Sequence, residues 1–375
     1  MGENLEKKTI VVSAVNFFEG GPLTVLNSNL SFVNEVLSSE YQIIALVHKK
    51  GLFDLHKLSK ITFIEFPKSR SSYFIRLYLE YYYFNILSKK WNPYLWFSLH
   101  DITPNVKAEI RAVYCHNPSP FKPKAITDLF FQPTLFFFSL FYKMLYQINI
   151  KKNNFVIVQQ IWIKEAFVEL FKLNRKKVLV SFPENENELS CPLNETSNSL
   201  RGKPDAFTFF YPALARPFKN FEIIGEAIKL LMEKGIVNFK VVVTMNGEEN
   251  NYAKHIFKKY SKLKPMEFVG MLSFEAVKKT YAESNALLFP STLETWGLPI
   301  TEFKAYRKPI LLSKLPYAFE TLGDYDKGSF FDPLDASDLA NKMQLLMDGK
   351  LQFDSTSINK ELVLNGWAEL FNKIL

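Results

Sequence analysis

The feature that most constrains the fold is the stretch of residues 286–312, ALLFPSTLETWGLPITEFKAYRKPILL. Ala286–Phe289 is a short apolar run followed by proline, which predicts a buried strand. A helix is expected to begin near Pro299, because proline is favoured in the first helical turn, and a second buried strand follows at Ile310–Leu312. This order predicts a βαβ unit of a parallel sheet. Its loop lies at the carboxyl end of the first strand, where open α/β sheets bind ligands.

Two carboxylates lie on either side of the glycine in that loop. Glu294 precedes Gly297, and Glu302 follows it one turn into the helix. The backbone N–H groups around Gly297 and Leu298 favour an anion, because the first N–H groups of a helix have no partner within it and the dipole is positive there. A phosphate bound here leaves the carboxylates to accept hydrogen bonds from hydroxyls. Phosphate and hydroxyls together suggest a nucleotide-sugar.

The spacing Glu294-x7-Glu302, with Gly297-Leu298-Pro299 inside it, resembles the E-x7-E signature of the retaining glycosyltransferases of family 4. An ordinary solvated loop and helix cap is the alternative explanation of the same residues. The resemblance implies the α/β GT-B fold, in which two Rossmann-like domains face each other across a cleft. It also implies sugar transfer from a nucleotide-diphosphate donor with retention of configuration.

A polar stretch divides the chain into two parts. Residues 182–203 are rich in Pro, Asn, Glu and Ser and have no apolar period, which predicts a linker. We therefore expect an acceptor-binding domain at residues 1–182 and a donor-binding domain at residues 183–375. The resemblance implies that a final amphipathic helix, residues 360–375, packs back on the first domain.

The donor site is expected to include a cation just before a helix. Lys219 precedes a helix predicted from Phe221, a position suited to a diphosphate. The family typically pairs this lysine with an arginine six residues earlier, but Ala213 stands there, and Arg216 is a substitute from a different angle. The resemblance implies that Glu294 holds sugar hydroxyls and Glu302 the ribose. The donor residues that it implies are Gly20, Gly21, Arg216, Lys219, Gly270, Met271, Thr295, Trp296, Gly297, Leu298 and Glu302.

The acceptor side is predicted from two neighbouring strand ends in the first half. One strand is followed by His100-Asp101, and the next is followed by His116-Asn117. Histidines just past strand ends are placed for a crevice, although a single histidine is more often structural. The family often has a histidine near the sugar and acceptor, and His116 fits that place best, with His100 as the second candidate. His116 and Glu294 are the catalytic candidates, and His100, Asp101 and Asn117 lie on the acceptor side.

Charge and aromatic residues point to a partner for the first half. Residues 1–182 carry a net charge of +10 and the remainder a net charge of −2, which indicates an anionic partner. Residues 70–90 predict a helix crowded with aromatic side chains, which is either a core helix or an interfacial helix at anionic lipid. Residues 125–150 predict either a buried helix pair or an element that dips into a membrane. An anionic membrane surface is therefore an expected partner, and nucleic acid is not.

The remaining motifs exclude several classes. Cys115 and Cys191 form no metal-ligand cluster, and Asp324-Tyr325-Asp326 only mimics the spacing of a D-x-D motif, so no metal or other cofactor is expected. No apolar run reaches the length of about 20 residues that a spanning helix needs. The start of the chain lacks a signal-peptide pattern. The sequence thus predicts a cytoplasmic protein, peripheral at the inner face of the cell membrane.

The predicted function is transfer of a sugar to a glycan or lipid-linked acceptor in cell-surface polysaccharide or lipopolysaccharide synthesis. One alternative is a nucleotide-sugar epimerase of the same fold. Another is a sugar- or lipid-binding protein without catalysis, which the altered position at Ala213 favours. A nicotinamide-dependent dehydrogenase fits least well, because the first strand–helix turn lacks the G-x-G-x-x-G fingerprint.

Overall fold

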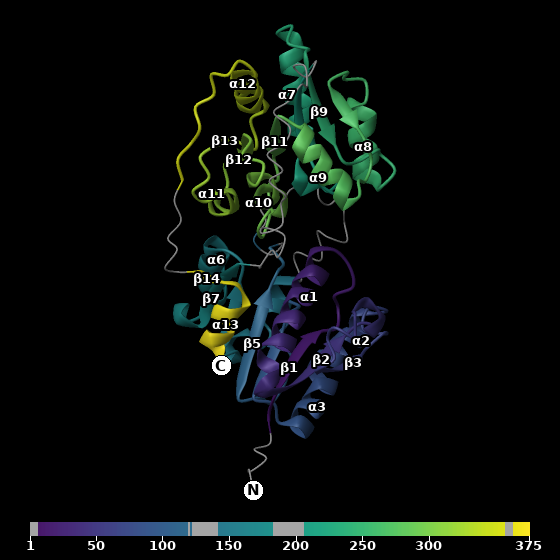
Figure 1. Cartoon of the computed structure of the whole chain (residues 1–375), viewed down its shortest axis with the longest axis vertical. Coiled ribbons are helices and arrows are strands. Elements are labelled where there is room, and N and C mark those ends of the chain that lie inside the picture. Colours follow the sequence, from purple (N-terminus) through teal and green to yellow (C-terminus); the bar gives the residue numbers. More distant parts are fainter. Residues whose placement is uncertain (1–6, 119–120, 122–141, 183–205, 357–362) are drawn as a thin grey trace. The chain divides into compact units, whose positions relative to one another are not determined.

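The computed structural model describes residues 7–118, 121, 142–182, 206–356 and 363–375 (Figure 1). They form two units. The described residues of the first unit are those up to 182 together with 363–375, and the second unit contains 206–356. Each unit has one parallel sheet covered by helices, which confirms the prediction of two Rossmann-like α/β domains. The predicted linker and most of the stretch 125–150 lie outside the described residues.

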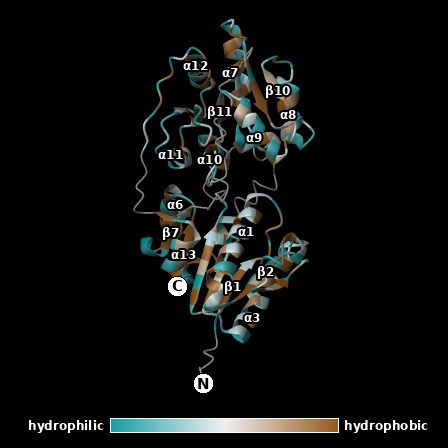
Figure 2. Cartoon of the chain, in the orientation of Figure 1, coloured by the Kyte–Doolittle hydropathy of each residue, from teal (hydrophilic) through white to brown (hydrophobic). Residues whose placement is uncertain are grey.

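The sheet of the first unit has eight strands in the order β14-β7-β6-β5-β4-β1-β2-β3, and every neighbouring pair is parallel. Its strands are nearly continuous apolar runs, as expected of a parallel sheet buried on both faces (Figure 2). Their bounds are β1 Lys8–Ala14, β2 Tyr41–Val47, β3 Ile61–Glu65, β4 Leu95–Ser98, β5 Ile110–Cys115, β6 Phe155–Val158, β7 Val178–Phe182 and β14 Val363–Asn365.

Helices cover both faces of this sheet. On one face α1, Gly20–Glu35, and α13, Gly366–Ile374, pack on alternate residues of β1, β2, β4 and β5. The other face is covered beside β1 and β2 by a run of α2 (Tyr73–Tyr78), a π-helical segment (Leu79–Tyr83) and α3 (Phe84–Trp91). Near β5, β6 and β7 it is covered by α6 (Ile161–Phe171) and the helical residues 142–147.

The end of the chain belongs to the first unit, and part of it is a strand. Residues 363–365 form β14 beside β7, and the helix begins only at Gly366. Trp367 and Phe371 are buried in the core of the first unit, and Trp367 Nε1 donates a 2.9 Å hydrogen bond to Ser28 Oγ of α1. A strand of three residues is too short to show a period of its own, so the sequence predicted a single helix.

The sheet of the second unit has six parallel strands in the order β10-β9-β8-β11-β12-β13. Its strands are β8 Phe207–Tyr211, β9 Phe239–Val243, β10 Met266–Phe268, β11 Ala286–Phe289, β12 Ile310–Ser313 and β13 Gly328–Phe331. Its helices are α7 Phe221–Glu233, α8 Asn251–Tyr260, α9 Phe274–Glu283, α10 Leu298–Lys304, α11 Pro316–Leu322 and α12 Ala336–Met347. The predicted βαβ unit is present as β11, α10 and β12, whereas α8 and α11 were not predicted.

Each sheet has a point where the strand order reverses. In the first unit this point lies between β1 and β4, and in the second it lies between β8 and β11. The loops that follow these strands diverge at the carboxyl edge and leave room for a ligand. His100 and Asp101 follow β4, and Glu294 follows β11. His100, Asp101, Lys219 and Glu294 therefore lie at the reversal points, whereas His116 and Asn117 follow β5, and Gly270 and Met271 follow the edge strand β10.

The aromatic helix of residues 70–90 is a core helix on one side only. Leu79 and Phe84 are buried against the sheet. On the other side the π-helical segment keeps four large side chains, spaced four residues apart, on an exposed row. This exposed row is Phe74, Tyr78, Tyr82 and Ile86, which are 84%, 53%, 59% and 48% exposed. No helix among the described residues is both long and apolar enough to cross a membrane.

Candidate functional site

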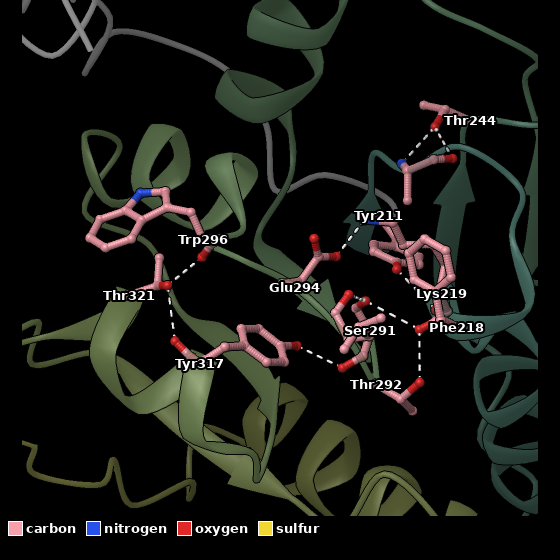
Figure 3. A network of polar contacts seen from close by, with 12 residues as sticks. Tyr211, Phe218, Lys219, Thr244, Ser291, Thr292, Glu294, Trp296, Tyr317 and Thr321 are labelled. Carbon is pink, nitrogen blue, oxygen red and sulfur yellow. Dashed lines mark hydrogen bonds and ion pairs between the residues drawn. The ribbon is translucent and has the colours of Figure 1, made fainter. Parts of the chain in front are cut away.

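The site in the second unit is built around one ion pair. Lys219 ends a short 3-10 turn, Pro217–Lys219, in the loop after β8, and Glu294 lies in the loop after β11. The Lys219 ammonium contacts Glu294 Oε1 (Figure 3). Only 17% and 14% of the two side chains are exposed. A pair so little exposed is screened weakly by water, so each charge depends on its partner.

Backbone and hydroxyl groups hold these two loops together. The Phe218 carbonyl accepts hydrogen bonds from the Thr292 backbone N–H at 2.7 Å and from Thr292 Oγ1 at 3.1 Å. Ser291 Oγ donates to the same carbonyl at 3.2 Å. Buried Tyr211 donates its hydroxyl to the Lys219 carbonyl at 2.9 Å, and burial with nearby Glu294 raises the pKa of this phenol. Lys219 and Glu294 are thus positioned by a network that spans both loops (Figure 3).

Helix α11 supports the same loop from its other side. Tyr317 donates its hydroxyl to the Ser291 carbonyl at 2.7 Å, and Thr321 Oγ1 donates to the Trp296 carbonyl. Trp296 in turn donates its indole N–H to Thr301 Oγ1 on α10 at 2.9 Å. The loop after β11 is therefore tied to α10 and α11, and Trp296 is part-buried (Figure 3).

Gly297 makes the turn into α10 possible. Its φ is +83°, in the left-handed region that favours glycine. A Cβ at this position would lie 3.0 Å from Ile300 Cδ1 and 3.3 Å from Phe289 Cε1. The backbone therefore turns closely over the end of β11, and α10 begins with Leu298. The first N–H groups of a helix have no partner within it, which suits an approaching anion.

Glu302 lies on α10, one turn beyond Leu298. Its Oε2 accepts a hydrogen bond from the Tyr281 hydroxyl of α9 at 2.9 Å. Burial raises the pKa of this carboxyl, and the Tyr281 hydroxyl and Lys278 oppose the rise. The second oxygen of the carboxylate is left to accept from a ligand hydroxyl.

The other donor candidates form a less connected set. Arg216 is exposed, and its side chain has no hydrogen-bond or ion-pair partner among the described residues. The backbone N–H and carbonyl of Ala213 both bond Thr244 Oγ1, at 2.9 and 3.1 Å. Gly270 has φ +73° and Met271 is 75% exposed at the end of β10. Thr295 and Leu298 are half-buried.

The site in the first unit centres on Asp101, whose φ is +69°. Asp101 Oδ1 accepts hydrogen bonds from the backbone N–H groups of His116 at 2.5 Å and Asn117 at 3.1 Å, and from the Tyr146 hydroxyl at 2.8 Å. Its Oδ2 accepts from the Tyr142 hydroxyl at 2.8 Å. Asp101 thus joins the ends of β4 and β5 to the helical residues 142–147, and it orients the backbone that carries His116.

His116 lies among aromatic rings. Its ring centroid is 5.4 Å from that of Phe17 and 4.6 Å from that of Tyr114. Gln159 Nε2 lies 3.3 Å from His116 Nδ1, and His116 Nε2 has no partner among the described residues. Burial lowers the pKa of the imidazole, although Asp101 opposes the shift. His116 is therefore neutral near neutral pH, and its Nε2 is a buried atom without a partner in the described part of the chain.

His100 faces the helix that covers the sheet. The side chain is 1% exposed, and its Nε2 lies 2.5 Å from Oε1 of the fully buried Glu80. Arg76 Nη2 donates to the His100 carbonyl at 3.2 Å. Gly20 and Gly21, predicted as a turn before the first helix, form the first turn of α1 instead, and a Cβ on either would have nothing within 4 Å.

Several residues of these two sites carry no local sequence signal. Tyr281 and Tyr317 position Glu302 and the loop after β11 from separate helices, and Tyr146 binds Asp101 from 45 positions away. Glu80 sits within an aromatic run and was not singled out. Among the described residues no group of three His, Cys, Asp or Glu side chains is arranged to hold a metal ion.

Comparisons with known proteins identify a family that the second half of the chain resembles. Residues 194–360 match the model of the family Glycosyl transferases group 1. The O-antigen chain mannosyltransferase RfbU of Salmonella typhimurium is 20% identical over 196 residues, which are 52% of this chain and 51% of that protein. The match thus spans about half the length of that relative.

Solved structures resemble the whole chain in fold. A glycosyltransferase from Rickettsia africae has a TM-score of 0.65 and 16% identity, covering 92% of this chain and 89% of its own. The apo form of the lipopolysaccharide outer core galactosyltransferase WaaB has a TM-score of 0.62 and 14% identity, covering 92% of each chain. The chain therefore has two parallel-sheet Rossmann-like domains of the GT-B type.

Proposed function

We propose that this chain is a family 4 glycosyltransferase that moves a sugar from a nucleotide-diphosphate donor to a glycan or lipid-linked acceptor with retention. The observation that carries the proposal is the poorly exposed Lys219–Glu294 pair at the reversal point of the second sheet, beside the Gly297 turn. A cation and free backbone N–H groups bind a diphosphate, and carboxylates beside them bind hydroxyls. The family match over residues 194–360 covers all of these groups.

The donor would bind by exchanging partners within this site. Lys219 turns from Glu294 toward the diphosphate, and Glu294 then accepts hydrogen bonds from the sugar hydroxyls. Glu302 accepts the ribose hydroxyls with the oxygen that Tyr281 does not use. The turn at Gly270 and Met271 meets the nucleobase through its backbone. Transfer needs little covalent help from the protein, because cations and N–H groups stabilise the charge on the leaving diphosphate.

His116 would orient the acceptor or the sugar near the reacting carbon. Its lowered pKa keeps the imidazole neutral near neutral pH, so Nε2 is available as an acceptor or donor rather than as a fixed charge. Asp101 holds the backbone of His116 and Asn117 and acts as a positioning residue. The acceptor attacks the face from which the phosphate departs, which gives retention. We propose that this transfer is independent of metal.

The acceptor would belong to cell-surface polysaccharide or lipopolysaccharide synthesis and would be met at the cytoplasmic face of the membrane. The exposed row of α2 to α3 and the net charge of +10 on residues 1–182 support this proposal. Aromatic rings favour the headgroup region, and cations favour anionic lipid.

The donor proposal is tested by ligand-induced thermal stabilisation with UDP, GDP, ADP and dTDP and their sugars. A ligand that binds only the folded state raises the melting temperature by mass action. We expect one nucleotide to stabilise the native protein, with a smaller effect on Lys219→Met and Glu302→Gln. The matched control is Lys240→Met, which breaks the exposed Lys240–Glu267 pair and leaves the response unchanged. If no nucleotide stabilises the protein, the transferase proposal fails and a binding protein without catalysis takes its place.

The membrane proposal is tested by co-sedimentation with vesicles of phosphatidylcholine, with and without phosphatidylglycerol, at low salt. We expect binding only to the anionic vesicles, and weaker binding by the double variant Phe74→Ser/Tyr82→Ser. A double variant at exposed side chains outside the row, Leu214→Ser/Leu334→Ser, is the control. Equal sedimentation with both vesicle types, or with neither, contradicts the proposal.

A further inference from the structure

A cavity opens at the carboxyl edge of the first sheet, and none of the predicted donor residues lines it. Its volume is about 300 Å³, and it lies between the loop after β1 and the loop that leads from β3 into α2. The residues that matter for its chemistry are Asn16, Phe18, Ser71, Ser72, Arg70 and Arg76. No residue of the predicted donor or acceptor set lines it.

The cavity has two guanidinium groups and no carboxylate. The exposed Arg70 guanidinium lies 3.1 Å from the centre of the Phe18 ring. Arg76 is only 7% exposed; its Nη2 donates to the His100 carbonyl, but its Nε has no partner. No carboxylate in the described part of the chain forms an ion pair with either arginine. A buried guanidinium without an anion is costly, so the cavity is suited to receive one.

Neutral groups complete the cavity. Ser72 Oγ accepts from the Phe74 backbone N–H, so its own O–H remains available to donate to a ligand. The Asn16 amide has no hydrogen-bond partner among the described residues and adds a further donor. Two guanidinium groups with hydroxyl and amide donors match the tetrahedral oxygens of a phosphoryl group, because guanidinium binds phosphate with paired hydrogen bonds.

We propose that this cavity binds a phosphoryl group of the acceptor, so that the acceptor is a phosphorylated molecule. The inference rests on the proposed function, which it deepens by naming the class of acceptor. The cavity is joined to the acceptor side, because Arg76 binds the His100 carbonyl and the Phe17 ring contacts both His100 and His116. A phosphoryl group at Arg70 and Arg76 would place the rest of the acceptor along the sheet edge toward His116.

The same helix connects the cavity to the exposed row. Phe74, the most exposed member of the row, follows Ser72 by two residues and precedes Arg76 by two. A lipid whose phosphate lies in the cavity would therefore have its chain beside this row. A soluble phosphorylated acceptor would bind the same cavity without contacting the exposed row. Experiment can therefore distinguish a lipid phosphate from the phosphate of a soluble acceptor.

The test maps arginine modification by phenylglyoxal with mass spectrometry, using inorganic pyrophosphate as the probe. We expect pyrophosphate to protect Arg70, whereas Arg175, which is paired with Glu165 on another surface, stays equally reactive as an internal control. Calorimetric titration is expected to show about tenfold weaker pyrophosphate binding at this site in Arg70→Gln and Arg76→Lys. The matched control Lys68→Gln removes an exposed cation from the same loop that does not line the cavity, so its binding should be unchanged.

The source of the phosphoryl group is resolved by two vesicle arms. A lipid-linked acceptor is supported if phosphatidylcholine vesicles that carry a polyprenyl phosphate protect Arg70, and if this protection is lost in the double variant Phe74→Ser/Tyr82→Ser. Protection by pyrophosphate alone supports a soluble phosphorylated acceptor. Protection by phosphatidylglycerol vesicles but not by pyrophosphate overturns the proposal, since the membrane then merely covers Arg70. The proposal is also overturned if pyrophosphate does not protect Arg70, or if its protection is lost in Lys219→Met. Neither outcome affects the thermal-stabilisation test of nucleotide binding.

Discussion

The Lys219–Glu294 pair allows a quantitative test of the proposed donor site. Breaking a buried ion pair from one side leaves an uncompensated charge and costs about 3–5 kcal/mol. Because these side chains are still 17% and 14% exposed, we expect Lys219→Met and Glu294→Gln each to lower the free energy of unfolding of the second unit by about 2–3 kcal/mol. The double variant removes both charges and should cost less than the two single changes combined, with a coupling energy of about 2 kcal/mol.

A matched pair in the same unit gives the control. Lys240 and Glu267 are 49% and 40% exposed, and such surface pairs contribute only about 0.2–1 kcal/mol. The same cycle at that pair, Lys240→Met and Glu267→Gln, should therefore give a coupling energy well below that of the buried pair. Any decrease in the free energy of unfolding that appears in both cycles reflects the removal of charge in general.

The assay must report on the second unit alone, because a protein of two units need not unfold in one step. Trp296 is the only tryptophan between residues 187 and 358. Fluorine NMR of protein labelled with fluorotryptophan gives Trp296 a resonance of its own, which can be followed through a urea titration. The resonance is assigned by its absence from the spectrum of Trp296→Phe. A saturating nucleoside diphosphate should reduce the coupling energy, because Lys219 then shares its charge with phosphate. A coupling energy no larger than that of the control pair, or one that nucleotide leaves unchanged, would refute the reasoning.

Three further predictions concern the second unit. Gly297→Ala forces a residue with a Cβ into the left-handed region, where the Cβ meets packed side chains. It should lower the free energy of unfolding of this unit by about 1–3 kcal/mol in a urea titration and weaken nucleotide binding in calorimetry. Unchanged nucleotide binding would contradict a role for this turn. Burial raises the pKa of Glu302 above 4.5, so the folded state holds this proton more tightly than the unfolded state, and the stability that Glu302 contributes is complete below pH 4.5 and is lost as pH rises through the raised pKa. Protonated Glu302 cannot accept hydrogen bonds from the ribose with both oxygens, so nucleotide affinity should fall as pH drops through the pKa of Glu302. Tyr281→Phe removes a hydroxyl that lowers this pKa, so it should move the midpoint of the affinity–pH curve upward. In Glu302→Gln this pH dependence should disappear. Gly225→Ala places a Cβ 2.4 Å from the Tyr260 ring, so it should cost about 1–3 kcal/mol of stability, whereas a gain would show that α7 and α8 separate easily.

The sequence predicted the regular parts of the chain well because the relevant forces are local. Buried parallel strands are apolar runs, and Gly297 with Pro299 marks a helix start, so β11, α10 and β12 lie within a residue or two of their predicted bounds. The elements that it missed are the three-residue strand 363–365, the seven-residue helix α11 and the ten-residue helix α8. Residues 363–365 and the seven-residue helix α11 are stabilised by neighbours distant in sequence rather than by their own pattern.

The first unit shows the same division. Residues 70–90 were predicted as a helix that is either buried or interfacial, and the structure shows a buried face together with an exposed row. Arg76 lies within this helix and is buried, although arginine side chains are mostly exposed. Only the π-helical segment, whose wider turn shifts the register of the side chains, determined which residues point outward.

The sequence by itself determined the fold class and the identity of the groups at the strand ends, since residue type and spacing along one element are enough for both. Only the tertiary structure decided which of those groups meet. Lys219 and Glu294 are 75 positions apart, and the parallel pairing of β8 with β11 brings their loops together. The predicted acceptor side likewise depends on Asp101, which binds groups from two other segments, the end of β5 and the helical residues 142–147. Such contacts arise from the closure of long loops around a sheet, and no local pattern records which ends a sheet will bring together.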